Sequence, residues 1–117
     1  MESHAAGAAA LLGDEALVRA VLDDYRAAPI SDGDKALLAF IEKVNGDARS
    51  IGPQDIETLH QAGWTDEAIF DAVTVCALFN FYNRWVDATG VKEMSPEGHR
   101  ASGARIARRG YRIATEE

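Results

Sequence analysis

The hydrophobic pattern is densest over residues 66–90, which read as one long helix over about residues 66–88. At 100° per residue, apolar side chains fall on nearly every side of this segment, which is typical of a helix covered by neighbours all round. Thr65 is a suitable N-cap and Gly90 a suitable C-terminal stop. We therefore expect this helix to lie at the centre of the fold.

Four polar residues lie within an arc about 100° wide near the end of that helix, namely Asn80, Asn83, Arg84 and Asp87. One or two turns earlier the same arc is apolar, whereas a solvated face would be polar along its whole length. The pattern predicts that the group is buried within the protein or at a subunit contact, with Arg84 paired to a carboxylate. Two interpretations stay open: a buried structural network, or a site in which Asn80, Asn83 and Arg84 bind a ligand.

The rest of the chain also reads as helix. Apolar stripes at helical spacing predict helices over residues 3–12, 15–26, 35–45 and 53–59, and a last helix opening at Ser95-Pro96-Glu97. Asp14 and the Ser31-x-x-Asp34 pattern are expected caps, and Gly46 an expected stop. No alternating segment is long enough for a sheet. The predicted fold is an all-α, single-domain bundle of five or six helices, with a helical domain over residues 1–97 and an Arg-rich helix or tail over residues 98–117.

Charge is distributed unevenly along the 117 residues. The chain carries a net charge of −7, yet five arginines and no acid fall between residues 98 and 115. The acidic remainder would repel phosphate and no recognition module is visible, so nucleic-acid binding is not expected. No basic leader and no long uncharged apolar run are present, so the sequence predicts no membrane span and a cytoplasmic location.

Reactive side chains are few. The single cysteine, Cys76, excludes an intramolecular disulfide and lies in an apolar run typical of an inert core thiol. The three histidines, His4, His60 and His99, are too scattered for a metal site by spacing. We expect no metal and no cofactor.

Three segments resemble a known family. They are ALFNFYNRWVDATGV from Ala77, KALLAFIEKV from Lys35 and PQDIETLHQAGWTDEAI from Pro53. In their order along the chain they are similar to the carboxymuconolactone decarboxylase and alkylhydroperoxidase D-like proteins, in particular the peroxidase-related branch. The resemblance covers roughly residues 4–91. It implies an antioxidant-type protein with the alkylhydroperoxidase D-like fold and a homo-oligomer with sites near the subunit contact.

The resemblance also implies a catalytic role for His4. The family motif Cys-x-x-Cys-x-x-x-His carries two thiols that reduce peroxides, and its histidine moves protons together with an upstream glutamate. His4, followed by small residues, matches that histidine, but both cysteines and the glutamate are absent here. Either the chain is a short homologue that lost the pair, or its start was placed downstream of the natural one.

Three functional hypotheses follow. The first is an alkylhydroperoxidase-like protein without dithiol turnover, because one thiol cannot replace a pair. The second is a lactone decarboxylase-type enzyme in which His4 transfers a proton and Asn83 or Arg84 binds a substrate carboxylate. The third is a non-enzymatic helical module that binds a small ligand or a partner.

Overall fold

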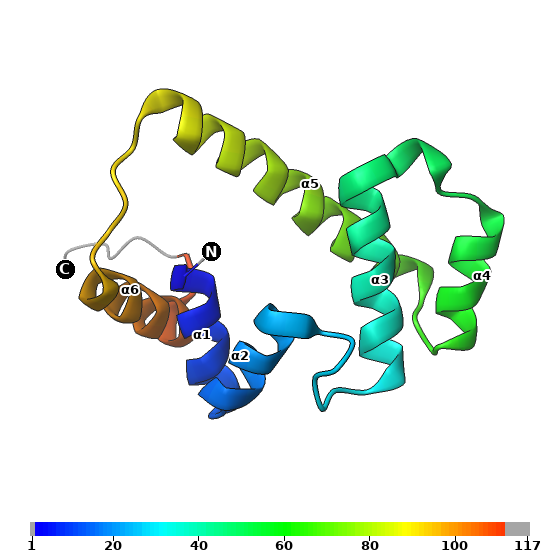
Figure 1. Cartoon of the computed structure of the whole chain (residues 1–117), viewed down its shortest axis with the longest axis horizontal. Helices are drawn as coiled ribbons and strands as arrows, with labels where there is room; N and C mark the ends of the chain where they lie inside the picture. Colours follow the sequence, from blue (N-terminus) through cyan, green and yellow to red (C-terminus); the bar gives the residue numbers. More distant parts are fainter. Residues whose placement is uncertain (1, 112–117) are drawn as a thin grey trace. The chain divides into compact units, whose positions relative to one another are not determined.

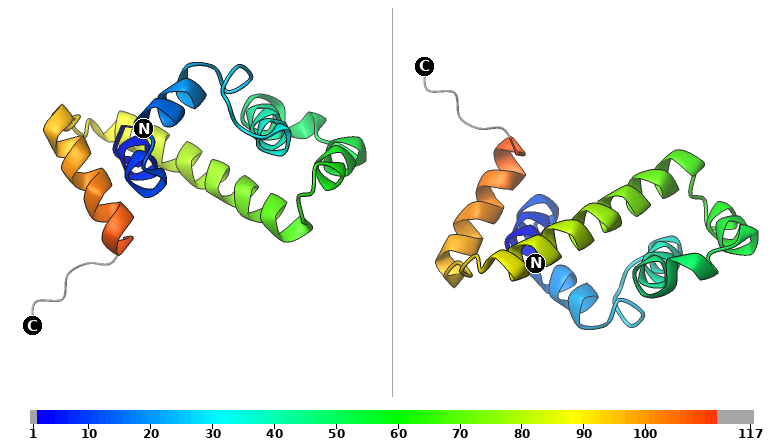
Figure 2. Two further views of the ribbon diagram at one scale, coloured as in Figure 1. Left: turned by 90° about the horizontal axis from the view of Figure 1, so that it is seen from below. Right: turned by 90° about the horizontal axis from the view of Figure 1, so that it is seen from above.

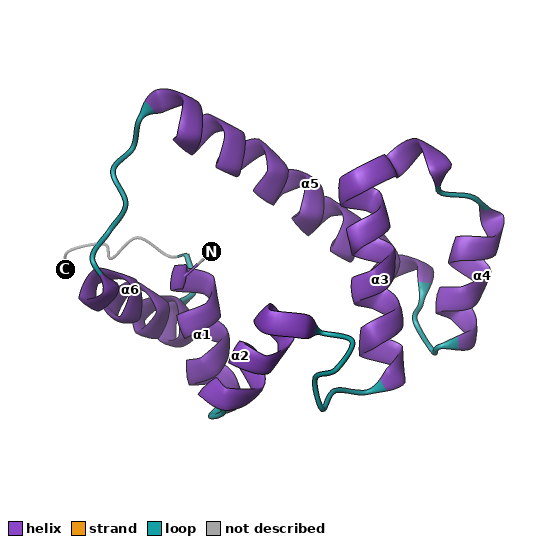
Figure 3. Cartoon of the chain, viewed as in Figure 1, coloured by secondary structure: helices purple, strands orange, loops and turns teal. Residues whose placement is uncertain are grey.

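The computed structural model describes residues 2–111, and the described chain is entirely helix and loop (Figure 1, Figure 3). The all-α prediction is therefore confirmed for these residues. They form six α-helices and one short 3₁₀ turn: α1 (Glu2–Leu12), α2 (Glu15–Asp24), α3 (Asp32–Asp47), η1 (Ala48–Ser50), α4 (Pro53–Gln61), α5 (Asp66–Thr89) and α6 (Pro96–Arg109). The end of the predicted Arg-rich segment, with Arg112, lies outside the described residues.

Helix starts follow the capping residues that the sequence indicates. The backbone N–H of the third helical residue donates to the side chain of Asp14, Ser31, Thr65 and Ser95, at 2.8, 3.0, 3.2 and 3.2 Å. Each bond satisfies one N–H that has no partner within its own helix. Local chemistry therefore sets these four boundaries.

Helix ends follow the glycines less closely. Gly90 adopts the left-handed conformation, with φ of 69°, and ends α5 as expected. The predicted stop at Gly46 is wrong, because α3 continues through it to Asp47. Helix α2 ends at Asp24, two residues before the predicted Arg26.

The described chain forms two compact units. Unit 1 contains α1, α2 and α6 with the segment before α6, and unit 2 contains α3, α4 and α5. In unit 1, α1 packs against both α6 and α2, and in unit 2, α3 packs against α4 and α5 (Figure 2). Each unit is built from helices in contact with one another, so the packing of each unit is described by itself.

Unit 2 has a small apolar core of Phe40, Leu59 and Ile69, one residue from each of its helices. Trp64 packs against this core and its indole N–H donates to the carbonyl of Gly33 at 2.8 Å. The polar end of the tryptophan is therefore satisfied while its ring remains available for packing.

Unit 1 depends instead on a close helix crossing. Gly7 of α1 and Gly103 of α6 are both buried where the two helices meet. A Cβ atom placed on Gly103 would lie 2.6 Å from the Cβ of Ala6 and 2.7 Å from the backbone nitrogen of Gly7. The crossing therefore requires glycine at residue 103, because no side chain fits between the backbones.

The expected burial of α5 is not found within one chain. Only Ile69 of this helix is buried, and several large apolar side chains are more than half exposed, including Phe70, Phe81 and Trp85 at 70, 60 and 53%. The apolar pattern correctly predicted a long helix. It did not reveal that most of its surface is left uncovered by the chain itself.

We expect Gly103→Ala to lower the free energy of unfolding by about 1–3 kcal/mol, because the added methyl group overpacks the α1–α6 crossing. Thermal and denaturant unfolding followed by circular dichroism measures the change.

The matched control is Gly46→Ala. This glycine lies inside α3, and a Cβ atom added to it would have no neighbour within 4 Å. Removing a glycine from a helix interior should stabilise the protein by about 0.5–1 kcal/mol. A Gly103→Ala protein as stable as the Gly46→Ala protein would contradict the crossing as described.

Candidate functional site

The polar group on α5 forms a hydrogen-bond chain around Asn80. Its amide donates to Asn45 Oδ1 at 2.7 Å and to the carbonyl of Cys76 at 3.1 Å. Arg84 Nη1 donates to the carbonyl and the Oδ1 of Asn80, at 3.1 and 2.8 Å. These hydrogen bonds therefore link α5 to the end of α3 and orient the Arg84 guanidinium along its own helix.

The single chain shows neither the burial nor the ion pair that the sequence predicts for this group within the protein or at a subunit contact, and both stay predictions for an assembly. Asn83, Arg84 and Asp87 are exposed in the single chain, and Asn80 is half-buried, so the predicted burial is not found. Among the described residues Arg84 bonds to Asn80 and to no carboxylate. The physical reason is that α5 extends beyond the helices that cover its first turns, so its second half meets solvent in one chain. Binding of a ligand by Asn80, Asn83 and Arg84 stays a prediction.

Cys76 lies beside this group. It is half-buried and free, and the Asn80 amide approaches its Sγ at 3.7 Å. Because the full sequence holds no other cysteine, the thiol has no resolving partner within the chain.

His4 lies on α1 in unit 1, where its Nε2 forms a 2.6 Å hydrogen bond with the hydroxyl of Tyr111. The residue is exposed overall, yet partial burial of the ring lowers the pKa of His4 from its ordinary value of 6.5. The imidazole is therefore predominantly neutral at about pH 7 and can exchange a proton with a bonded hydroxyl.

A second histidine of unit 1 was not singled out by the sequence. His99 Nδ1 lies 2.8 Å from Ser3 Oγ, and its Nε2 lies 3.9 Å from Glu93 Oε1. Ser3 is buried, and Nε2 is buried without a hydrogen-bond partner among the described residues. The sequence carries no signal for the Ser3–His99 and His4–Tyr111 contacts, whose partners are 96 and 107 residues apart.

Unit 1 also contains a pocket of about 900 Å³ between α1, α2, α6 and the segment before α6. Its lining combines small apolar side chains of α1 with charged side chains of α2 and α6. Neither His4 nor Arg84 is among the lining residues, which include Ala5, Ala9, Arg19, Glu93, Met94 and His99. The pocket is thus a site separate from both groups that the sequence indicated.

Metal and membrane sites are not found in the described part of the chain. No group of three or more histidine, cysteine, aspartate or glutamate side chains between residues 2 and 111 could hold a metal ion. None of the helices in this range is long and apolar enough to cross a membrane. No family model and no curated protein matches the chain in comparisons of sequence.

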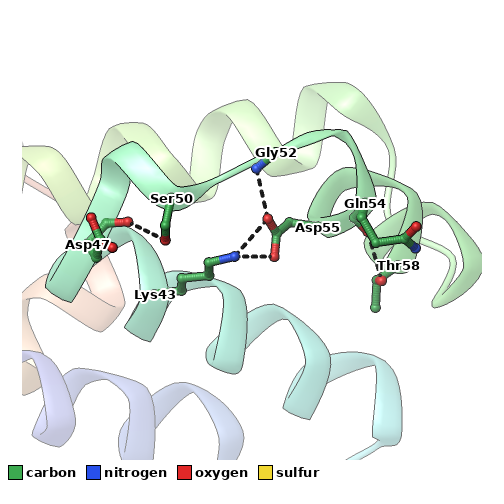
Figure 4. Close-up of polar contacts among 7 residues, drawn as sticks. All are labelled: Lys43, Asp47, Ser50, Gly52, Gln54, Asp55 and Thr58. Carbon is green, nitrogen blue, oxygen red and sulfur yellow. Dashed lines mark hydrogen bonds and ion pairs between the residues drawn. The ribbon is translucent and has the colours of Figure 1, made fainter.

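One polar cluster of unit 2 is structural. Figure 4 shows Lys43 Nζ donating to both carboxylate oxygens of Asp55, at 2.8 and 2.9 Å, while the N–H of Gly52 donates to Oδ2 at 2.8 Å. The carboxylate thereby caps the start of α4 and ties it to α3. The bond from Lys43, and then that from Gly52, lower the pKa of Asp55 below its ordinary 3.8.

This cluster makes stability depend on pH in a defined direction. A carboxyl group with a lowered folded-state pKa stabilises the protein above its unfolded pKa and loses that contribution as pH falls through the folded value. Asp55→Asn should therefore lower thermal stability at about pH 7, and the difference from the unchanged protein should shrink towards about pH 2. Thermal unfolding of both proteins across this pH range tests the expectation.

Asp47→Asn is the matched control, because the Asp47 side chain is exposed and forms no cap hydrogen bond. It should change stability little at either pH. A pH-independent loss in Asp55→Asn would show that the ionised carboxylate is not what stabilises this junction.

Proposed function

We propose that this chain is a homologue of the carboxymuconolactone decarboxylase and alkylhydroperoxidase D-like proteins, of the antioxidant, peroxidase-related type, with the fold of that family and a cytoplasmic location. In this proposal it retains the proton-transfer histidine of the family as His4 and carries out no dithiol turnover by itself. Three resembling segments in matching order and an all-helical structure support the family assignment.

The observation that carries the proposed role of His4 is its short hydrogen bond to Tyr111. A catalytic acid or base needs a pKa near the working pH and a partner within hydrogen-bond reach. His4 has such a partner, because its Nε2 is 2.6 Å from a hydroxyl, and its lowered pKa leaves the ring neutral and able to accept a proton. The ring can accept a proton in its neutral form and return it.

Thiol chemistry in the family requires two sulfurs. One thiolate attacks a peroxide oxygen, releases the alcohol and becomes a sulfenic acid, and a second thiol displaces water from it to form a disulfide. An external dithiol then reduces that disulfide. Cys76 supplies one sulfur only and lies on α5, whereas His4 lies on α1.

A lactone decarboxylase-type activity is the second candidate. The favouring observation is that the His4–Tyr111 pair can move a proton without any thiol. The residues that the sequence offers for a substrate carboxylate, Asn83 and the exposed Arg84, belong to unit 2, whereas His4 belongs to unit 1. A module that only binds a ligand is the remaining alternative, and an absence of both peroxide reduction and lactone decarboxylation would favour it.

The family assignment is tested by restoring the missing thiols. We expect the 117-residue chain to show no dithiol-dependent reduction of an organic hydroperoxide. An N-terminal extension that places Cys-x-x-Cys directly before Met1 completes the motif with His4 and should confer that activity. His4→Gln in the extended chain should then lower the rate by roughly 10²–10⁴-fold, the usual contribution of general acid–base catalysis.

The matched control is the same extension with Ser-x-x-Ser, which should be inactive. An extended Cys-x-x-Cys chain that folds but reduces no peroxide would count against the resemblance. Robust activity of the unextended chain, abolished by Cys76→Ser, would instead identify Cys76 as the nucleophile.

We also propose that the chain forms a homo-oligomer through α5. The exposed apolar side chains of this helix, among them Phe70, Val75, Phe81, Tyr82 and Trp85, are 51–70% exposed in the single chain. A large uncovered apolar surface on a folded protein marks an interaction site.

Phe81→Glu should therefore shift the protein towards monomer in sedimentation velocity at micromolar concentration, because the added charge would be desolvated at the contact. Asp71→Asn, an exposed polar change on the same helix, should leave the assembly unchanged. A chain that is already monomeric before any substitution would refute the proposed assembly.

A further inference from the structure

The pocket of unit 1 has the features of a ligand site that neither the resemblance nor the proposed role of His4 assigns. We propose that it binds a medium-chain monocarboxylate. The apolar tail lies along the alanines of α1, and a carboxylate oxygen accepts a hydrogen bond from His99 Nε2 and pairs with Arg19. The volume of this pocket, about 900 Å³, falls in the range of small-molecule pockets, about 300–1,000 Å³.

The wall that would hold the tail is apolar and smooth. Ala5, Ala6, Ala9 and Ala10 line the pocket from α1, and Val18, Leu22 and Met94 line it from the neighbouring segments. Leu22 and Met94 are 43 and 48% exposed, so covering them with an aliphatic chain removes apolar surface from water. Such a wall offers no hydrogen bonds to a polar ligand body.

The proposed hydrogen-bond donor at the polar end, His99, is held by Ser3. This hydroxyl is buried, and its hydrogen bond among the described residues is to His99 Nδ1 at 2.8 Å. In the proposed arrangement the Ser3 hydroxyl donates to Nδ1, and the ring proton lies on Nε2. The observation behind this arrangement is that Nε2 of His99 is buried without a hydrogen-bond partner among the described residues, which is unfavourable for a polar atom.

The space next to that N–H is occupied by a movable carboxylate. Glu93 Oε1 is 3.9 Å from Nε2, too far for a hydrogen bond, and the Glu93 side chain is 84% exposed. It can therefore turn into solvent without loss of packing, and a ligand carboxylate can take its place closer to Nε2. Glu93 thus competes with the ligand for His99.

A positively charged lining residue of α2 favours an anion. Arg19 of α2 lines the pocket and forms no ion pair within residues 2–111, whereas Arg100 of α6 is paired with Glu97 at 3.0 Å. Glu15 also lines the pocket but is exposed, where solvent screens its repulsion. The Arg19 guanidinium is the group that would pair with a carboxylate.

The test measures octanoate binding to the full chain by isothermal titration calorimetry, below the concentration at which it forms micelles. We expect a dissociation constant of about millimolar or lower, in line with the usual limits for so small a ligand. Octanol, which has the same tail and no charge, should bind about tenfold more weakly, because it lacks the charged hydrogen bonds. Backbone amide shifts should change around Ala9 and His99 and not around Phe81.

Three variants test the proposed contacts, two of which should weaken octanoate binding and one of which should strengthen it. His99→Phe and Arg19→Gln should each weaken octanoate binding about tenfold, because each removes a charged hydrogen bond. Glu93→Gln should strengthen it, because it removes a competing charge. Arg105→Gln, an exposed change on α6 outside the pocket lining, should change nothing.

Arg19→Gln and Glu93→Gln alter exposed side chains, so they decide the question even if His99→Phe fails to fold. The proposal is overturned if octanoate does not bind at millimolar concentration, if octanol binds equally well, if Glu93→Gln weakens binding, or if the shifts centre on α5. Because His4 does not line the pocket, these outcomes are independent of the proposed proton-transfer role.

Discussion

Unit 1 depends on one contact, the backbone-to-backbone approach of α1 and α6 at Gly7 and Gly103. With only hydrogen atoms as side chains, the two helices come close enough that a methyl group on Gly103 would lie 2.6 Å from Ala6. The same approach places Ser3 within hydrogen-bond distance of His99. A wider crossing, with a side chain between the helices, would separate that pair and change the walls of the pocket. The Ser3–His99 contact and the shape of the pocket in unit 1 therefore depend on this helix packing.

Unit 2 differs from unit 1 in that it has more apolar surface than its three helices can cover. Phe40, Leu59 and Ile69 form a core near the start of α5, while Phe81 and Trp85, further along, are left more than half exposed. Apolar surface of this extent favours burial against another surface at about 25 cal/mol per Å². The hydrogen bond from Asn80 to Asn45 lies between these two regions and joins α5 to the end of α3.

Features set by neighbouring residues could be predicted from the sequence, and features set by packing could not. The caps at Asp14, Ser31 and Thr65 were predictable because a side chain bonds to a backbone N–H three residues later. Arg84 is exposed in the single chain, and its burial at a subunit contact stays a prediction, because an apolar arc shows that a helix face will be buried but not which surface buries it. Tyr111 and His99 could not be identified, since their partners are about a full chain length away.

The two histidines of unit 1 show how one packing arrangement supports different chemistry. His4 and Ser3 are adjacent on α1 and so project in different directions, about 100° apart around the helix. The His4 ring reaches Tyr111 at the exposed side, where its lowered pKa leaves the ring neutral and able to accept a proton. Ser3 instead bonds to His99 inside the pocket wall, where the buried Nε2 suits recognition of a fixed oxygen. Exposure, more than residue type, therefore separates the proton-transfer candidate from the binding candidate.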